Sequence, residues 1–319
     1  IGNFKGSAKA FVWVTDEKVS VKLSTKSVVY TGKEITLAED EIKVFRGKTE
    51  VDKAHYSVTY LNNVNAGTAT VIVKGDEKNF VGEAVATFKI TPKTMKEADD
   101  EIIVKMAEEK MFTGNPVELE AQEIEMFDSK AGAYMTNATD FTLKYSSNTK
   151  IGTAKVTLSG KGNYKGKIQK TFKITKLKDF AQAKIMTEVT SCTFNGKAQK
   201  PKLMVYYNEN GALVELNVSK VFTVTYKENK EPGMGIAILK PKKGIFETVT
   251  DETIEVKFLI EKAGIEDAKA NVIKVQPYKG KAVTPKVSLK LGSYKLKEGV
   301  DYTVEYENND SRGRATIII

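Results

Sequence analysis

Residues 141–158 read FTLKYSSNTKIGTAKVTL, and this stretch decides the fold. Phe141, Leu143 and Tyr145 alternate with polar residues, so the three apolar side chains fall on one face of a strand. A turn is expected next, because asparagine and glycine both tolerate positive φ. Residues 153–158 again alternate in the manner of a strand. The stretch therefore predicts a β-hairpin with one face in a core.

The same pattern occurs four times along the 319-residue chain. The pattern Tyr-x-x-Asn-x-x-x-Gly begins at Tyr60, Tyr145, Tyr226 and Tyr306, and its glycines are Gly67, Gly152, Gly233 and Gly313. A second marker, aromatic-x-Gly, begins at Tyr30, Phe112, Phe194 and Tyr278. Because two independent markers share one period of about 80 residues, the chain is predicted to be a tandem array.

Short alternating strands separated by turn signals predict an all-β fold of tandem immunoglobulin-like β-sandwich modules, with β-grasp-like modules as the alternative. The connections are short and not rich in glycine or serine, which favours a semi-rigid rod. An irregular edge is expected at Gly233-Met234-Gly235, where repeat 3 departs from the pattern. The expected boundaries are 1–14 for the closing strands of an incomplete module, 18–91 for repeat 1, 99–175 for repeat 2, 183–261 for repeat 3, and 268–319 for repeat 4, which lacks its last strands.

Residues 145–154, 160–166 (GKGNYKG) and 170–174 (KTFKI) together resemble the bacterial Ig-like tandem repeats of large Gram-positive cell-surface proteins. The resemblance implies an extracellular location, at the bacterial cell surface or cell wall, and a non-catalytic role as a stalk or fibre. Two alternatives stay open: an adhesin that binds a host glycan or matrix protein, and the accessory region of a surface enzyme. The fold alone does not choose among them.

Charge and cysteine content limit the partners. The net charge is +9, but the lysines are scattered along the chain, which indicates a solvated surface and no nucleic-acid partner. Cys192 is the single cysteine, so an internal disulfide is excluded. No apolar run approaches the roughly 20 residues that span a bilayer, and no signal-peptide pattern opens the sequence. We therefore expect no membrane insertion in this segment.

No catalytic constellation stands out from the repeats. His55 is the only histidine, and it is far in sequence from Cys192. A nucleophile needs a base within hydrogen-bond reach, and none of the common catalytic motifs is present. His55 is expected to be a surface residue and Cys192 a small strand hydrophobe. The prediction is that the chain is not an enzyme, with no catalytic residue and no cofactor.

Metal binding and covalent cross-links are also not expected. A solvated loop explains the acidic run at 97–101, whose Ca²⁺ candidates are Glu97, Asp99, Asp100 and Glu101. Lys–Asn isopeptide cross-links need an asparagine on a buried strand. The repeated asparagines are instead explained by turn chemistry; they are Asn62, Asn63, Asn148, Asn229 and Asn308.

The two ends of the sequence are complementary. Residues 2–14 match 162–174, the closing arm of repeat 2, and repeat 4 lacks such an arm. One explanation is that a longer array was cut; the other is that residues 1–14 of one molecule complete repeat 4 of the next. The second explanation predicts a head-to-tail partner of the same chain. Its candidate contact residues are Phe4, Phe11, Val12, Trp13, Val14, Ile317, Ile318 and Ile319.

Overall fold

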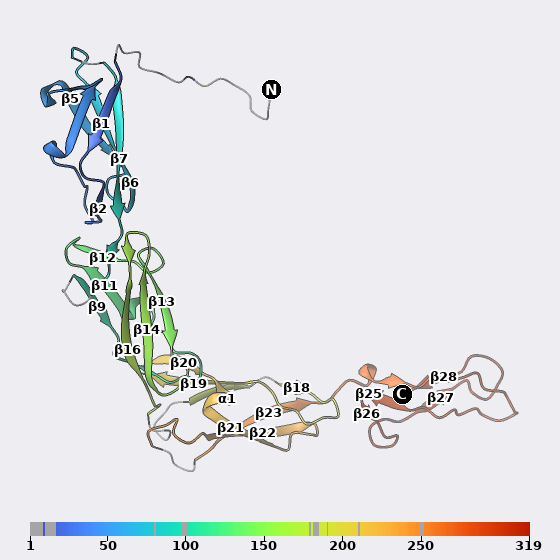
Figure 1. Ribbon diagram of the computed structural model, residues 1–319. Coiled ribbons are helices and arrows are strands. Elements are labelled where there is room, and N and C mark those ends of the chain that lie inside the picture. The colour runs from blue at the N-terminus through green and yellow to red at the C-terminus, as the bar shows by residue number, and fades with distance from the viewer. Residues whose placement is uncertain are drawn as a thin grey trace. The chain divides into compact units, whose positions relative to one another are not determined.

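The computed structural model describes residues 9, 17–79, 81–96, 101–178, 180, 185–189, 191–209, 211–248 and 252–319 (Figure 1). Almost all regular structure in these ranges is β, and the only α-helix there is the four-residue α1 (Val218–Val221). Two compact units are present. The first takes in the chain up to Lys110 with Glu118–Asn148 and Gly152–Lys173, and the second takes in Met111–Val117, Thr149–Ile151 and Ile174–Ile319.

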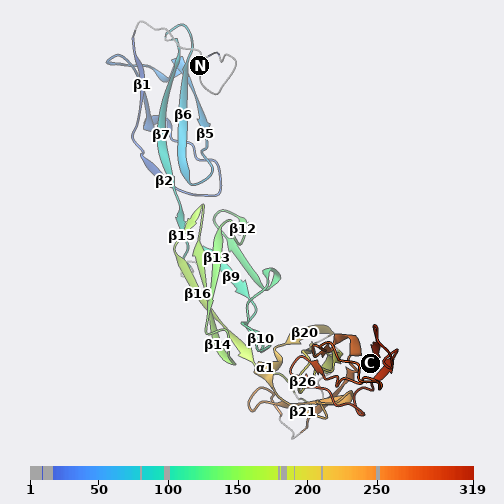
Figure 2. The same cartoon turned by 90° about the vertical axis from the view of Figure 1, so that its right-hand side faces the viewer.

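Repeat 1 is a sandwich of two sheets. One sheet has the order β1 (Val19–Leu23), β3 (Ile42–Arg46), β4 (Thr49–Glu50). The other has the order β2 (Ser27–Val29), β7 (Glu83–Thr91), β6 (Gly67–Gly75), β5 (Tyr56–Leu61). Strands β5, β6 and β7 lie side by side (Figure 2), and β7 pairs with β2 in parallel. Side chains from both sheets, among them Val44, Val71 and Phe88, form one buried cluster. The core therefore lies between the sheets, as in an immunoglobulin-like sandwich.

The alternation of side chains explains why these segments are strands. Along β6 the side chains of Ala69, Val71 and Val73 are fully buried, whereas the residues between them are partly exposed. Along β7 the inward residues are Ala84, Ala86, Phe88 and Ile90. A period of two places one face of each strand in the core. This pattern, together with the absence of any long helix in the described ranges, favours the sandwich over the β-grasp alternative.

Repeats 2 and 3 have the same pair of sheets. In repeat 2 one sheet has the order β12 (Ala133–Met135), β11 (Ile124–Asp128), β9 (Ile102–Met106). The other has the order β10 (Glu109–Met111), β16 (Lys167–Thr175), β14 (Gly152–Gly160), β13 (Phe141–Ser146). In repeat 3 one sheet has the order β17 (Ile185–Val189), β19 (Leu203–Glu209), β20 (Ala212–Leu216). The other has the order β18 (Cys192–Thr193), β23 (Ile254–Glu261), β22 (Gly233–Pro241), β21 (Phe222–Lys227). In each case the closing strand lies second in the four-stranded sheet, between a short strand and a nine-residue strand.

Repeat 4 differs in its second sheet. Its first sheet has the order β24 (Lys269–Ala270), β25 (Leu289–Leu291), β26 (Tyr294–Lys295). The second holds only β27 (Glu305–Glu307) and β28 (Thr316–Ile318), the counterparts of β5 and β6. No described strand of repeat 4 takes the place that β7, β16 and β23 hold in the other repeats.

In the turn after each repeated tyrosine, the asparagine does not have the role that the sequence predicts. The glycines of the pattern do have positive φ, at +153° for Gly67 and +135° for Gly152. The other positive φ falls on the residue before the repeated asparagine, for example Asn62 and Ser147. The asparagine itself is buried in repeats 1 to 3, and Asn63 Nδ2 donates a 3.0 Å hydrogen bond to the Ile35 carbonyl. Tolerance of positive φ is therefore the wrong reason for this asparagine, which fastens one loop to another.

The expected irregular edge in repeat 3 is not seen. β22 is a regular nine-residue strand, equal in length to β6 and β14. Gly235 takes the place of Ala69 because the ring of Phe258 occupies the space that a Cβ would fill. Among the described residues, no helix is both long and apolar enough to cross a membrane.

Candidate functional site

Three residues fasten repeat 1 to repeat 2, all of them within the first compact unit. Lys93 of β8 (Lys93–Thr94) pairs in parallel with Tyr164 of β15 (Tyr164–Lys165), in the closing arm of repeat 2. Lys93 Nζ donates a 2.7 Å hydrogen bond to Asp128 Oδ1, and the Tyr164 hydroxyl donates a 3.2 Å hydrogen bond to Asp128 Oδ2. Asp128 is fully buried. We call the position of these three residues joint 1.

The charge of Asp128 is stabilised where it is buried. Burial raises the pKa of this carboxyl, but hydrogen bonds from Lys93, the Ala131 amide and Tyr164, with the attraction of the Lys93 ammonium, more than offset that effect. The pKa of the Asp128 carboxyl therefore lies below its usual value. The pKa of Tyr164 is raised, first by burial and then by the neighbouring Asp128 charge. Joint 1 therefore holds a buried ion pair with a neutral tyrosine.

The second compact unit has residues at the corresponding three positions, which we call joint 2. Leu177 corresponds to Lys93, and it bridges in parallel to Phe246, which corresponds to Tyr164. Tyr207 on β19 corresponds to Asp128 on β11, and all three joint 2 residues are buried. The ring of Phe246 lies 5.2 Å from that of Phe180 in an edge-on contact. An aliphatic residue and two aromatic residues thus take the positions of the ion pair and its tyrosine.

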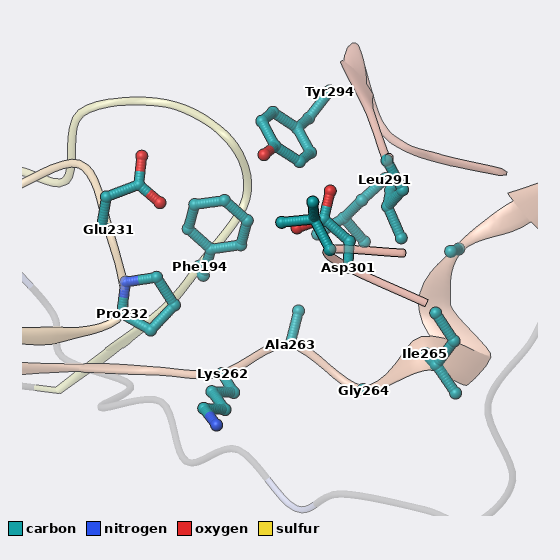
Figure 3. A pocket seen from close by; sticks show the side chains of 13 residues that line it. Phe194, Glu231, Pro232, Lys262, Ala263, Gly264, Ile265, Leu291, Tyr294 and Asp301 are labelled. Carbon is teal, nitrogen blue, oxygen red and sulfur yellow. The ribbon is translucent and has the colours of Figure 1, made fainter. Parts of the chain in front are cut away.

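Joint 3 lies between repeats 3 and 4. Two of its three positions have a corresponding residue, and a pocket lies beside them. Ala263 corresponds to Lys93, and Leu291 corresponds to Asp128. Both line a pocket of about 280 Å³, shown in Figure 3, together with Phe194 and Tyr294. The rings of Phe194 and Tyr294 are 5.2 Å apart in an edge-on contact. At joint 1 the counterpart of Phe194 is Tyr30, whose ring contacts Tyr164 at 5.5 Å.

A second hollow, which we call the strand groove, lies within repeat 4. It has a volume of about 600 Å³ and runs between residues 273–278, the counterpart of β2, and residues 311–317, the counterpart of β6. Tyr306 lines it, with Val283 and Pro285. The strand groove therefore occupies the place of the closing strand in the other repeats.

Core positions beside the strand groove are exposed. Ala154, Val156 and Leu158 have no exposed surface in repeat 2, and their counterparts in repeats 1 and 3 are buried or are glycine. Their counterparts in repeat 4 are Ala315, which is exposed, Ile317, which is partly exposed, and Ile319, which is 42% exposed. Val275, at the other side of the groove, is 99% exposed. An edge of this kind is open to strand addition.

Only some of the expected site residues lie within the part of the chain that the structure describes. Phe4, Phe11, Val12, Trp13 and Val14 lie outside the described residues, and so do Glu97, Asp99 and Asp100. Of the expected contacts at the other end, Ile317 lines the strand groove, and Ile318, on the opposite face of β28, is 42% exposed.

The remaining candidates have structural partners. Glu101 forms ion pairs with Lys130 and, at 3.7 Å, with Lys93. His55 Nδ1 lies 3.0 Å from Asp76 Oδ2, and Cys192 Sγ lies 3.9 Å from the Leu259 carbonyl. Within the described ranges no group of three or more His, Cys, Asp or Glu residues is arranged to hold a metal ion.

Sequence reasoning missed all three joints and the pocket at joint 3. The signal for joint 1 was present as an aromatic residue after Gly-Asn, at Tyr164 and at Phe4. What the sequence does not show is that this aromatic residue packs across to the preceding repeat.

No family model matches the chain, and no curated protein matches it either. Two solved structures align over 92% of the chain. One is domains 4–9 of the surface layer protein SbsC, at 13% identity and a TM-score of 0.21, and the chain spans 48% of that structure. The other is the EC3-6 cis-dimer of protocadherin gammaB7, at 10% identity and a TM-score of 0.19, with 86% of that chain covered. The assignment to tandem immunoglobulin-like sandwiches rests on the sheet topology of the chain itself.

Proposed function

We propose that the chain is a non-catalytic structural region of a Gram-positive surface protein, and that it acts outside the cell as a stalk or fibre. We further propose that copies join head-to-tail, with residues 1–14 of one copy completing repeat 4 of the next. The observation that supports this proposal is the strand groove of repeat 4. It is lined by Ala315 and Ile317, which are exposed or partly exposed although their counterparts in the other repeats are buried.

The amino-terminal sequence suits this groove. Residues 8–14 read AKAFVWV, and residues 84–90 of β7 read AVATFKI. The inward positions of β7 are Ala84, Ala86, Phe88 and Ile90. We call residues 1–14 the donor segment. Its corresponding residues are small or apolar at every one of these positions: Ala8, Ala10, Val12 and Val14. A strand that is apolar on alternate residues is what a half-open sandwich accepts.

The pairing in repeat 1 gives the expected register. Ala69 pairs with Phe88, and Val71 pairs with Ala86. Transferred to repeat 4, Ala315 pairs with Val12 and Ile317 pairs with Ala10. The outward positions then fall on Phe11 and Trp13, so these two side chains would lie on the outer surface of the completed sheet.

Donor and acceptor are different surfaces of one chain, so the contact is heterologous, and a contact of this kind builds an open filament unless its rotation closes a ring. Each added copy presents a new strand groove, and the proposed product is an open filament.

Sedimentation velocity at increasing concentration tests the proposal. The intact chain should form a series of species of increasing mass. Ile317→Asp should abolish the series, because a carboxylate would be buried in the completed core. Ile318→Asp is the matched control, since Ile318 lies on the other face of β28. An intact chain that stays monomeric at every concentration would refute the filament.

A further inference from the structure

We infer that repeat 2 carries a binding site for an extended acidic peptide, which adds as a strand to the open edge of β9 and pairs its carboxylates with lysines of a groove between β9 and β16. We call this hollow the basic groove. It lies within the first compact unit and has a volume of about 600 Å³, in the range of ligand clefts, roughly 300–1,000 Å³. The site is separate from the strand groove and does not require head-to-tail assembly.

The backbone of β9 offers hydrogen-bonding groups to a new strand. β9 lies at one end of its three-stranded sheet, so among the described strands only β11 pairs with it. The Ala107 amide donates to the Glu123 carbonyl, and bonds of this kind recur at every second residue of an antiparallel pair. The amides and carbonyls of Val104 and Met106 therefore point away from β11, and both residues line the basic groove. An edge of this kind accepts a further strand.

The charge of the basic groove is mainly positive. Its charged lining residues are Lys105, Lys170, Lys173 and Glu108. Lys105 also forms an exposed ion pair with Glu125, at 3.7 Å. Three cations against one anion in the lining attract a negatively charged ligand, and the attraction is stronger in a groove than on an open surface because less water screens it.

Lys170 takes a position that is small or apolar in the two other complete repeats. Its counterparts are Ala86 in repeat 1, which packs against the buried cluster, and Val256 in repeat 3, which is buried. Lys170 is partly exposed and lies in the inward phase of β16, two positions before the buried Phe172. A cation at this position adds no apolar contact to the core, so the needs of the sandwich do not explain it. An ion pair with a ligand carboxylate does.

The same lysine selects the kind of strand that binds. A charged residue in the inward phase at a sheet edge hinders the addition of an apolar strand, and it repels a basic one. The outward amides and carbonyls of β9 match the backbone of a peptide, which a phosphate or sulfate polymer does not possess. Because successive side chains of a strand point to opposite faces, the ligand that fits has acidic residues alternating with small or apolar ones.

Fluorescence anisotropy on the full chain tests the site. The probes are short labelled peptides in which valine alternates with glutamate, glutamine or lysine, and inorganic polyphosphate serves as an anion without a peptide backbone. Lys170→Ala places the repeat 1 residue in repeat 2. The matched control is Lys167→Ala, whose side chain is exposed on the same strand outside the groove lining. Hydrogen exchange of residues 102–108 reports on the edge of β9.

The glutamate peptide should bind, and added salt should weaken it. The glutamine and lysine peptides should bind at least about tenfold more weakly, because they lack the charge-assisted hydrogen bonds. Lys170→Ala should weaken the glutamate peptide by about tenfold, whereas Lys167→Ala should change its affinity less than about twofold. Lys170→Glu should reverse the preference in favour of the lysine peptide. The glutamate peptide should protect residues 102–108, and polyphosphate should not.

Three results would overturn the site. One is a glutamate peptide that does not bind the intact chain. Another is an equal effect of Lys170→Ala and Lys167→Ala, which would mean that the peptide binds scattered surface lysines. The third is binding without protection of residues 102–108, or equal protection by polyphosphate, which would exclude strand addition at β9.

Discussion

Lys93 Nζ lies 2.7 Å from Asp128 Oδ1, and the two side chains come from the connection after repeat 1 and from strand β11 of repeat 2. Asp128 is fully buried, and the Lys93 side chain is 9% exposed. The repeats are thus joined by a buried ion pair that belongs to neither sandwich alone. At joint 2 the same three positions hold Leu177, Tyr207 and Phe246, so the ion pair is one of two sets of side chains found at these positions.

Removing the Lys93 side chain should destabilise the first compact unit. Lys93→Ala leaves the Asp128 carboxylate buried without its cation, and we expect a loss of about 3–5 kcal/mol in the unfolding free energy of the first compact unit. Lys105→Ala is the control, because the Lys105–Glu125 pair is exposed and contributes little. Chemical denaturation followed by circular dichroism measures both. Equal effects would show that joint 1 does not stabilise the unit.

Acid should weaken joint 1. The pKa of Asp128 is lowered in the folded state, since Lys93 and Tyr164 hold its carboxylate. The resulting stabilisation is fully present above the unfolded-state value of about 3.9 and is lost as the pH falls through the lower, folded-state pKa. The triple variant Lys93→Leu, Asp128→Tyr and Tyr164→Phe places the residues of joint 2 at joint 1 and should lose this part of the acid dependence. An unchanged pH profile of the melting temperature in that variant would contradict the assignment.

The sequence was sufficient to predict the strands, the repeat period and the inward face, because these depend on local alternation and on spacing. Tyr145 illustrates this: its place on the inward face followed from Phe141 and Leu143 alone. The joints could not be predicted, since Lys93 and Asp128 are 35 positions apart and nothing local shows that they meet. The buried asparagines were misread for the same reason, because the partner of Asn63 is the distant Ile35 carbonyl.

The two faces of β13 should respond differently to mutation. Tyr145 is half-buried, its ring lies 6.3 Å from Phe172, and its hydroxyl accepts a hydrogen bond from the Leu119 amide. Tyr145→Ser should cost about 3 kcal/mol, while Thr142→Ser on the exposed face should be nearly neutral. Thermal melts of the two variants compare them. Similar losses would mean that the strand faces are assigned wrongly.

A larger apolar side chain at position 12 should make the donor segment bind the strand groove more tightly. At the position of Val12 the other repeats have phenylalanine, as Phe88, Phe172 and Phe258. In repeats 2 and 3 this ring contacts the repeated tyrosine at 6.2–6.3 Å, and in repeat 4 that tyrosine, Tyr306, lines the strand groove. A synthetic peptide of residues 1–14 with Val12→Phe should therefore bind the chain about 1 kcal/mol, or several-fold, more tightly than the natural peptide of residues 1–14, as measured by fluorescence anisotropy. Weaker binding would indicate a different register.

The most direct test of head-to-tail assembly mixes two disabled chains. Val12→Asp removes the donor and keeps the strand groove, whereas Ile317→Asp removes the groove and keeps the donor. Sedimentation velocity should find each variant monomeric alone, and an equimolar mixture should give a species of twice the monomer mass and nothing larger. A mixture that stays monomeric while the intact chain assembles, or single variants that still assemble, would contradict strand complementation.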